Sequence, residues 1–121
     1  MPIFVIQEHN ATKKHWDLRL ELNNVLKSWA VTKIPPKIKS IKRLAIQVPD
    51  HPLDYANFEG EIKEGYGKGT VKLWDRGTYE LEDKSDKKFV FNLNGKNLKG
   101  RYALIKTSYG KDKNSWLFFK I

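Results

Sequence analysis

The sequence contains no cysteine and no long apolar run. The missing cysteine excludes disulfides, thiolate zinc sites and thiol nucleophiles. No stretch approaches the roughly 20 apolar residues of a membrane helix. The N-terminus also lacks the basic start and small-residue cleavage site of a signal peptide. We therefore expect a soluble, cytoplasmic protein without a membrane partner.

Signs of a second domain are also missing. The 121 residues show no internal repeat, low-complexity tract or interdomain linker, and compact domains commonly run to roughly 100–150 residues. We expect a single domain over residues 1–121 and a monomer.

Acidic residues are in the minority. The chain has 23 lysines and arginines against 14 aspartates and glutamates, which gives a net charge of +9. Such a balance favours a polyanionic partner such as nucleic acid, because each phosphate contact releases condensed counterions. A lysine-rich surface that serves only solubility is the alternative, and charge alone leaves both open.

Helical periodicity is scarce, and short runs of β-branched, aromatic or alternating apolar residues predominate. The expected strands are residues 4–9, 15–22, 28–32, 43–48, 70–75, 88–93, 101–106 and 115–121. Turn residues lie between them, and Asn94-Gly95 predicts a two-residue hairpin turn. Residues 37–42 and 52–59 are the candidates for short helical turns. The pattern predicts a mainly β fold, a small single-domain β-barrel of about eight strands with short helical turns.

The segment from His15 to Leu22 alternates strictly between two kinds of residue. Apolar residues fall on one face, and the other face carries His15, Asp17, Arg19 and Glu21. An exposed strand would also present a polar face. These residue types also indicate a metal and phosphate site, because imidazole and carboxylate bind metals while arginine matches a phosphate bidentately.

His9 adds a third candidate ligand, and five residues separate it from His15. A hairpin-like turn between them would bring the two imidazoles together across neighbouring strands. Two histidines and one aspartate leave coordination positions open for water or substrate, as catalytic metal sites require. The sequence thus predicts a metal site at His9, His15 and Asp17, although this spacing alone is only moderately specific.

The remaining candidates are weaker when taken singly. His51 follows Asp50, which could orient its ring, and Tyr55 lies in the same segment. Lone loop histidines are more often surface residues than catalysts. Lys33 and Arg43 place cations at the ends of apolar stretches. No Ser-His-Asp triad or nucleophile elbow is present.

Longer strings resemble the 3′-phosphoesterase domain of bacterial ATP-dependent DNA ligase D and its stand-alone relatives. The most specific block is His15-Trp16-Asp17-Leu18-Arg19-Leu20-Glu21. Further blocks follow in the family's order at residues 4–9, 26–31 with Lys33, 42–45, 50–55, 58–60, 74–79 and 100–104. Together they cover essentially the whole chain. Trp16 stands where the family usually has tyrosine, but alternation turns it away from the ligands.

This resemblance implies a small β-barrel whose site lies in a groove. It implies a divalent metal, usually manganese (Mn2+) with Zn2+ or Co2+ as alternatives, held by His9, His15 and Asp17. It further implies catalytic or phosphate-binding roles for Arg19, Lys33, Arg43, His51, Tyr55 and Gln7.

The implied activity is resection of a 3′ end in DNA repair. A phosphodiesterase step removes a terminal ribonucleoside, and a phosphomonoesterase step then hydrolyses the remaining 3′-phosphate. The substrates would be DNA or RNA-tipped DNA 3′ ends of a primer–template, with a DNA ligase and polymerase acting in trans. The chain begins almost at its first strand, without the extension found in ligase-fused members, so the balance between the two steps stays open.

Two other functions fit the sequence. One is a non-catalytic basic β-barrel that binds single-stranded nucleic acid on exposed tryptophans, and the other is a hydrolase of small phosphoesters. The binder requires exposed tryptophans and no metal. Trp16 and Trp29 lie in apolar or alternating strands, which favours burial and the enzyme.

Overall fold

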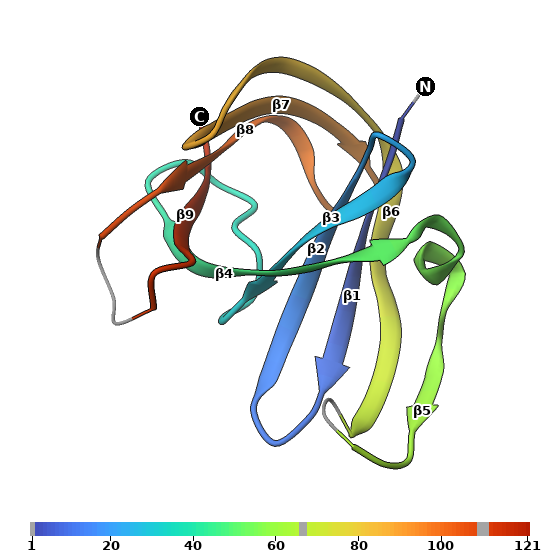
Figure 1. Ribbon diagram of the computed structural model, residues 1–121. Coiled ribbons are helices and arrows are strands. Elements are labelled where there is room, and N and C mark those ends of the chain that lie inside the picture. Colours follow the sequence, from blue (N-terminus) through green and yellow to red (C-terminus); the bar gives the residue numbers. More distant parts are fainter. Residues whose placement is uncertain (1, 66–67, 109–111) are drawn as a thin grey trace.

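The computed structural model describes residues 2–65, 68–108 and 112–121, and its strands close into an antiparallel barrel (Figure 1). The elements in chain order are β1 (Ile3–Asn10), β2 (Lys14–Leu22), β3 (Val25–Val31), β4 (Lys42–Pro52), the 3₁₀ helix η1 (Leu53–Asn57), β5 (Gly60–Ile62), β6 (Gly69–Ser85), β7 (Lys88–Gly95), β8 (Lys99–Lys106) and β9 (Ser115–Lys120). Eight strands run around the barrel in the order β1-β2-β3-β4-β9-β8-β7-β6, and pairing of β6 with β1 closes it. The predicted β-barrel of about eight strands is confirmed.

Two features of the strand pattern differ from the prediction. β5 was not expected, and it pairs with the end of β6 that lies beside the tip of β1. β6 was expected to end at Asp75 but continues to Ser85. Its first half pairs with β1 and its second half with β7, so one long strand serves both sides of the closure.

The buried Asp75 side chain explains why β6 continues. Its carboxylate accepts hydrogen bonds from backbone N–H groups of Arg76, Lys96, Asn97 and Leu98. Close by, a Cβ atom at Gly77 would lie 2.0 Å from the carbonyl oxygen of Asn94, so only glycine fits between β6 and β7. The polar residues 75–78 would suit a turn, but contacts with residues 94–98 keep them extended.

The predicted hairpin turn at Asn94-Gly95 is wrong. Both residues lie in β7, and the chain reverses after them, where the N–H of Gly95 donates to the carbonyl oxygen of Leu98 at 2.9 Å. Asp75 binds three N–H groups of this turn. A long-range interaction therefore outweighs the local preference of Asn-Gly.

The helical content is as small as expected. η1 lies within the predicted residues 52–59. The other candidate, residues 37–42, is wrong: Lys39 forms a β-bridge with Lys120, whose Nζ donates to the carbonyl oxygen of Lys37. Backbone groups that a helix would need are therefore engaged with the C-terminal strand. The described residues contain no helix of the length and hydropathy needed to span a membrane.

The tryptophans lie in or against the barrel core. Trp16, Trp29 and Trp116 are 9%, 0% and 2% exposed, and Trp74 packs against the same core as a partly buried residue. Trp29 meets Trp116 edge to face, with ring centroids 5.8 Å apart. Three of the four indoles are thus unavailable for stacking on nucleic acid, which argues against the tryptophan-based binder.

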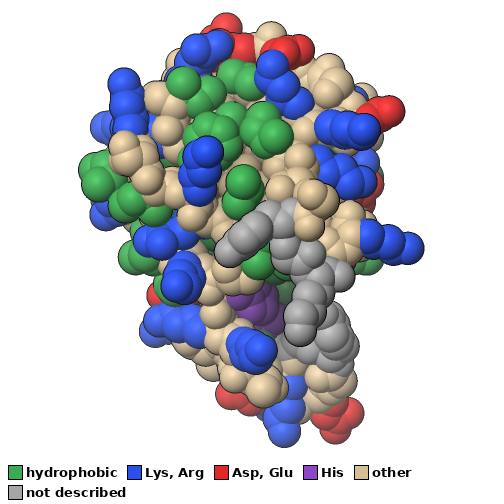
Figure 2. Space-filling model, turned by 90° about the vertical axis from the view of Figure 1, so that its left-hand side faces the viewer, with side chains coloured by type: hydrophobic (Ala, Val, Ile, Leu, Met, Phe, Trp, Pro, Cys, Tyr) green, Lys and Arg blue, Asp and Glu red, His purple; other side chains and the backbone are tan. Residues whose placement is uncertain are grey.

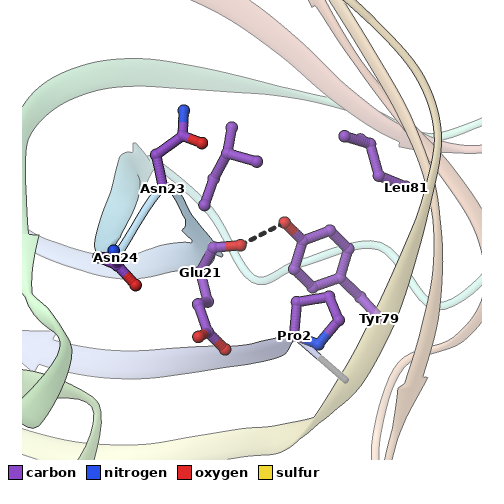
Figure 3. Close-up of a pocket in the computed structure, with 7 residues that line it drawn as sticks. Pro2, Glu21, Asn23, Asn24, Tyr79 and Leu81 are labelled. Carbon is purple, nitrogen blue, oxygen red and sulfur yellow. Dashed lines mark hydrogen bonds between the residues drawn. The ribbon is translucent and has the colours of Figure 1, made fainter.

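The turn between β2 and β3 closes one end of β2. Asn23 and Asn24 adopt positive φ angles of 53° and 66°, as the two central residues of a type I′ turn require. A hollow at this end is lined by Pro2, Glu21, Leu22, Asn23, Asn24, Tyr79 and Leu81 (Figure 3). Inside it, the Tyr79 hydroxyl donates to the carbonyl oxygen of Glu21 at 2.6 Å (Figure 3). None of the candidate site residues lines this hollow.

Candidate metal centre and phosphate site

The two faces of β2 differ: one faces the barrel core, and the other carries polar side chains. The apolar face enters the core as predicted, with Trp16, Leu18 and Leu20. The opposite face is also largely buried, since Asp17 is 6% and Arg19 is 3% exposed. Burial of a charged face is costly unless each charge is paired and hydrogen-bonded, which marks this face as more than a solvated surface.

The hairpin of β1 and β2 brings the three predicted ligands together. His9 pairs directly with His15 across the strands, and their ring centroids lie 4.7 Å apart. The Asp17 carboxylate has Oδ2 at 3.5 Å from His9 Nδ1 and Oδ1 at 3.3 Å from His15 Nε2. One ligand atom of each residue lies within 4.8 Å of the others. We refer to His9, His15 and Asp17 as the His–His–Asp triad.

The donor set of the triad suits a divalent cation, and the two Asp17–histidine contacts, at 3.5 and 3.3 Å, have the spacing of neighbouring metal ligands. Metal bonds of roughly 2.0–2.2 Å at tetrahedral or octahedral angles put neighbouring ligand atoms about 3.0–3.5 Å apart. The orientation of His15 also suits a ligand, because its Nδ1 lies 3.1 Å from the carbonyl oxygen of Lys13. An Nδ1–H that donates to this carbonyl leaves Nε2 as the ligand atom beside Asp17; metal-binding histidines usually donate their other ring N–H to such an acceptor.

The electrostatics of the triad favour a cation between its members. The hydrogen bond with Asp17 raises the pKa of His15, against the opposing effect of burial. Burial acts to raise the pKa of Asp17, but the hydrogen bond with His15 and the charge of Arg19 together hold that pKa below its ordinary value. Asp17 is therefore ionised at neutral pH and attracts positive charge to the space beside both imidazoles.

Arg19 connects the triad to the rest of the site. Its Nε donates to Gln7 Oε1 at 2.6 Å and its Nη1 donates to Ser28 Oγ at 2.8 Å. Nη1 also lies 3.1 Å from His51 Nδ1, and Nη2 lies 3.4 Å from Asp17 Oδ2. Among the described residues, Nε and Nη1 thus have hydrogen-bond partners, whereas Nη2 lies at ion-pair distance from Asp17. Nη2 is the nitrogen through which Arg19 reaches the triad.

Gln7 holds Arg19 and η1 in one arrangement. It is fully buried, and while its Oε1 accepts from Arg19, its Nε2 donates to the carbonyl oxygens of Tyr55 at 2.8 Å and Phe58 at 3.2 Å. The Tyr55 ring in turn lies 4.8 Å from the Arg19 guanidinium. Both polar atoms of the Gln7 side chain thus have protein partners, so Gln7 positions Arg19 rather than facing solvent.

His51 lies at the end of β4 rather than in a loop. Its Nδ1 is 3.1 Å from Arg19 Nη1 and 3.1 Å from the carbonyl oxygen of Pro49. Because arginine only donates, the first contact needs a lone pair on Nδ1 and the second needs a proton there, so each neutral tautomer satisfies one of them. Burial and the nearby Arg19 charge lower the pKa of His51. Asp50 does not orient the ring, since it pairs with Lys27 at 3.1 Å.

Two predicted cations, Lys33 and Arg43, are not bonded to this network in the part of the chain that the structure describes. Lys33 follows the end of β3 and is exposed. Arg43 shares its face of β4 with the core residue Ala45, and its Nε donates to the carbonyl oxygen of Ile34 at 2.8 Å. Within the described part of the chain, neither makes a hydrogen bond or ion pair with Asp17, Arg19 or His51.

Ser28 is a site residue that the sequence did not reveal. It pairs with Arg19 across β2 and β3 and is fully buried. Its hydroxyl accepts from Arg19 and donates to the carbonyl oxygen of Leu26 at 3.0 Å. The available signal was a small polar residue inside an otherwise apolar strand, which gains meaning only once the register with Arg19 is known.

One face of the molecule carries many lysine and arginine side chains around recessed histidine side chains (Figure 2). His15 keeps 23% of its side chain exposed, whereas His9 is 9% exposed at the side chain. A partly open cation site beside buried Arg19 is an arrangement suited to an anionic substrate.

The comparisons with known proteins agree with this geometry. The sequence pattern of the DNA Ligase D 3′-phosphoesterase domain matches residues 7–106. The chain is 51% identical over 110 residues to the multifunctional non-homologous end joining DNA repair protein LigD of Mycobacterium tuberculosis, covering 87% of this chain and 14% of that protein. It is 46% identical over 123 residues to LigD of Pseudomonas aeruginosa, covering 97% and 15%. The chain therefore spans about a seventh of the length of these relatives. It belongs to the DNA ligase D 3′-phosphoesterase domain family.

Proposed function

We propose that this chain is a metal-dependent phosphoesterase that processes the 3′ ends of nucleic acids during DNA repair. It removes a 3′-terminal ribonucleoside from a primer and then hydrolyses the remaining 3′-phosphate. The observation that carries the proposal is the His–His–Asp triad in contact with buried Arg19. Membership of a 3′-phosphoesterase family supports the reaction class, and the net charge of +9 supports a nucleic-acid substrate.

The triad would hold one divalent cation, and we favour manganese, with zinc or cobalt as alternatives. When bound, such a cation polarises a phosphate oxygen and lowers the pKa of a coordinated water. His9 and His15 supply neutral nitrogen ligands and Asp17 supplies the negative charge. The exposed side of His15 leaves the approach from solvent open to the substrate.

Arg19 would stabilise the negative charge of the transferring phosphoryl group. Because its Nε and Nη1 already donate to Gln7 and Ser28, Arg19 would meet the phosphate mainly through Nη2 and act as a fixed charge rather than as a bidentate clamp. Gln7 and Ser28 keep it in place before the substrate arrives, and such preorganised donors are effective because they need no reorganisation during the reaction.

Lys33 and Arg43 would add positive charge from the rim of the site. Lys33 follows β3 and Arg43 lies in β4, and a bound nucleic-acid strand could reach both through its phosphates. We expect Arg43→Ala to reduce turnover on the order of 10²-fold, comparable with loss of one transition-state donor.

His51 would donate a hydrogen bond to the substrate from Nε2. Its lowered pKa favours the neutral ring, and the tautomer that accepts from Arg19 at Nδ1 carries its proton on Nε2. That proton can stabilise a phosphate oxygen in the transition state by hydrogen bonding, whereas protonation of the leaving ribose oxygen would require the imidazolium form, which the lowered pKa disfavours. Tyr55 would assist by holding the ring, with centroids 4.8 Å apart.

A labelled primer–template that ends in one 3′-ribonucleotide tests the proposal. We expect manganese-dependent removal of the ribonucleoside followed by conversion of the 3′-phosphate to a 3′-hydroxyl, resolved by gel electrophoresis. His9→Ala and His15→Ala should abolish both steps. Glu21→Gln is the matched control, since Glu21 lies on the same face of β2 but hydrogen-bonds Ile3 at the far end.

Three outcomes would contradict this function. Normal turnover by a triad variant, after metal depletion and restoration of manganese, would remove the ligand assignment. Tight binding of the primer without turnover would indicate a nucleic-acid binder. Equal turnover of a small phosphomonoester such as p-nitrophenyl phosphate would indicate a general phosphoesterase.

The names of the relatives suggest the biological setting. They are multifunctional non-homologous end joining proteins, and this chain matches only a small part of each. We propose that it prepares DNA ends alongside a DNA ligase and a polymerase acting in trans. Addition of the protein should then raise the yield of ligated product from ends that carry a 3′-phosphate.

A further inference from the structure

Tyr55 and Phe58 form a stacked pair beside the phosphate site. Their ring centroids are 5.1 Å apart with an interplanar angle of 15°. The 3₁₀ turn explains the pairing, because side chains three residues apart eclipse one another in this geometry. The N–H of Phe58 closes the turn by donating to the carbonyl oxygen of Tyr55 at 3.0 Å. With His51 at 4.8 Å from Tyr55, the three rings make what we call the aromatic shelf.

The aromatic shelf leads away from the reacting groups. His51 and Tyr55 both contact Arg19, at 3.1 Å and 4.8 Å, and so mark the phosphate end. Phe58 is the outermost ring. Tyr55 already has the Arg19 guanidinium and the Phe58 ring as neighbours, whereas Phe58 is only half-buried and belongs to neither hydrophobic cluster of the described residues.

The same buried side chain, Gln7, holds both the aromatic shelf and Arg19. Gln7 Nε2 donates to the carbonyl oxygens of both Tyr55 and Phe58, and Gln7 also holds Arg19. Gly60 lies beside the ring, since a Cβ there would meet the ring atom Cζ of Phe58 at 3.8 Å, an ordinary van der Waals distance. The position of Phe58 is therefore set relative to Arg19 through one buried side chain.

We propose that Phe58 is a base-stacking residue that recognises the nucleobase next to the reacting phosphate. This inference rests on the proposed function and deepens it, since it names what lets the site prefer a nucleic-acid end over a small phosphoester. Phenylalanine has no hydrogen-bonding group, so the contact suits any base; stacking on an aromatic side chain is sequence-tolerant because every base has a π-face. Because Phe58 follows the rings that touch Arg19, it meets the nucleoside when the phosphate lies at Arg19.

The competing role for Phe58 is structural support of Tyr55. If Phe58 only supports Tyr55, loss of its ring should impair the reaction of every substrate equally, through Tyr55 and Arg19. If Phe58 stacks on a base, the impairment should depend on whether that base is present. Substrates with and without that base therefore separate the two roles.

The experiment combines Phe58 variants with abasic substrates. Primer–templates ending in a 3′-ribonucleotide carry either normal bases or an abasic residue at the terminal or the penultimate nucleotide. Wild type, Phe58→Leu and Phe58→Trp are compared for KM and kcat with manganese. Phe58→Leu keeps an apolar side chain without a ring, and Phe58→Trp keeps a stacking surface.

We expect Phe58→Leu to raise KM by roughly five- to tenfold for normal primers, the low end of base-stacking effects for a half-buried ring. This penalty should vanish when the base that stacks is absent, and the position of the abasic residue that removes it identifies the nucleotide. Phe58→Trp should retain the wild-type KM. An equal penalty on all substrates, or none on normal primers, would overturn the inference.

A binding measurement keeps this test independent of turnover. Quenching of 2-aminopurine at the two 3′-terminal positions reports stacking even if no cleavage occurs. Wild type should quench the fluorophore and Phe58→Leu should not, while thermal unfolding verifies that both are folded. Absence of turnover together with Phe58-dependent quenching would contradict the proposed function alone, whereas turnover without Phe58-dependent quenching would contradict the stacking role alone.

Discussion

Asp17 and Asp75 are two buried carboxylates of one barrel, 6% and 4% exposed, with opposite kinds of partner. Asp75 accepts four backbone N–H groups from β6 and from the turn after β7. Asp17 meets only side chains in the contacts described above, those of His9, His15 and Arg19.

The difference between the two carboxylates separates structure from chemistry. The partners of Asp75 are backbone N–H groups, so its carboxylate links β6 to the turn after β7 as part of the fold. The imidazoles around Asp17 can exchange protons or bind a metal without unfolding anything. Burial and charge alone therefore do not mark a functional carboxylate, whereas the kind of partner does.

The largest effect is expected from Asp17→Asn. The amide offers a neutral oxygen in place of the anionic ligand, so manganese binding and both phosphoesterase steps should fall below detection while the protein stays folded. Calorimetric titration with manganese and the labelled-primer assay measure the two losses. Asp75→Asn is the matched control and should bind manganese normally when folded; if it too lost the metal, the contrast between the carboxylates would fail.

Asp75→Asn should produce the largest loss of stability. The amide keeps one acceptor oxygen for the three N–H groups bound at Oδ1, but it turns an NH2 group toward the Leu98 N–H, which then lacks an acceptor. We expect the free energy of unfolding to fall by about 1–3 kcal/mol, the cost of one unsatisfied buried donor, measured by urea denaturation. Asp17→Asn should lose clearly less, and a larger loss there would reverse the comparison.

Arg19→Lys tests the side-chain network around Asp17. One ammonium group cannot contact Gln7, Ser28, His51 and Asp17 together, since lysine lacks the planar fork of arginine. We expect turnover to fall on the order of 10²-fold, with a smaller change in manganese affinity, because the triad is intact. Lys27→Ala removes an exposed ion pair with Asp50 and should have little effect on turnover; a comparable drop in that control would show that charge in general, not this network, matters.

The smallest effect is expected at high pH and comes from Tyr79, which resembles Asp75 in bonding to backbone. Burial, with the nearby Glu21 charge, raises the pKa of Tyr79 from 10.0 to about 12. The stability that depends on the neutral hydroxyl is therefore complete below pH 10 and is lost as the pH rises toward 12. At pH 11 the loss should be about 1.4 kcal/mol.

Urea denaturation of wild type and Tyr79→Phe at pH 8 and pH 11 measures this contribution. Phenylalanine cannot ionise, so the variant should lose less stability over this interval. Tyr102, whose pKa burial also raises to about 12, provides the parallel variant Tyr102→Phe. An identical pH dependence in all three proteins would show that neither hydroxyl limits alkaline stability.

Much of the site could be predicted from sequence because its key residues are local. His9, His15 and Asp17 lie on one hairpin, and strand alternation alone puts His15 and Asp17 on one face. Two of the wrong expectations, the Asn94-Gly95 turn and the end of β6 at Asp75, share one cause. Both depend on the Asp75 carboxylate, whose hydrogen bonds reach residues 96–98 and are invisible to any local pattern.

The sequence by itself determined the alternating strands, the basic surface and the residue types of the triad, since these depend on side-chain chemistry and on neighbours within a few positions. Only the tertiary structure decided that Ser28 and Gln7 hold Arg19 and that His51 and Tyr55 reach it from β4 and η1. The physical reason is closure of the barrel. Register between strands, rather than distance along the chain, decides which polar side chains share a buried face.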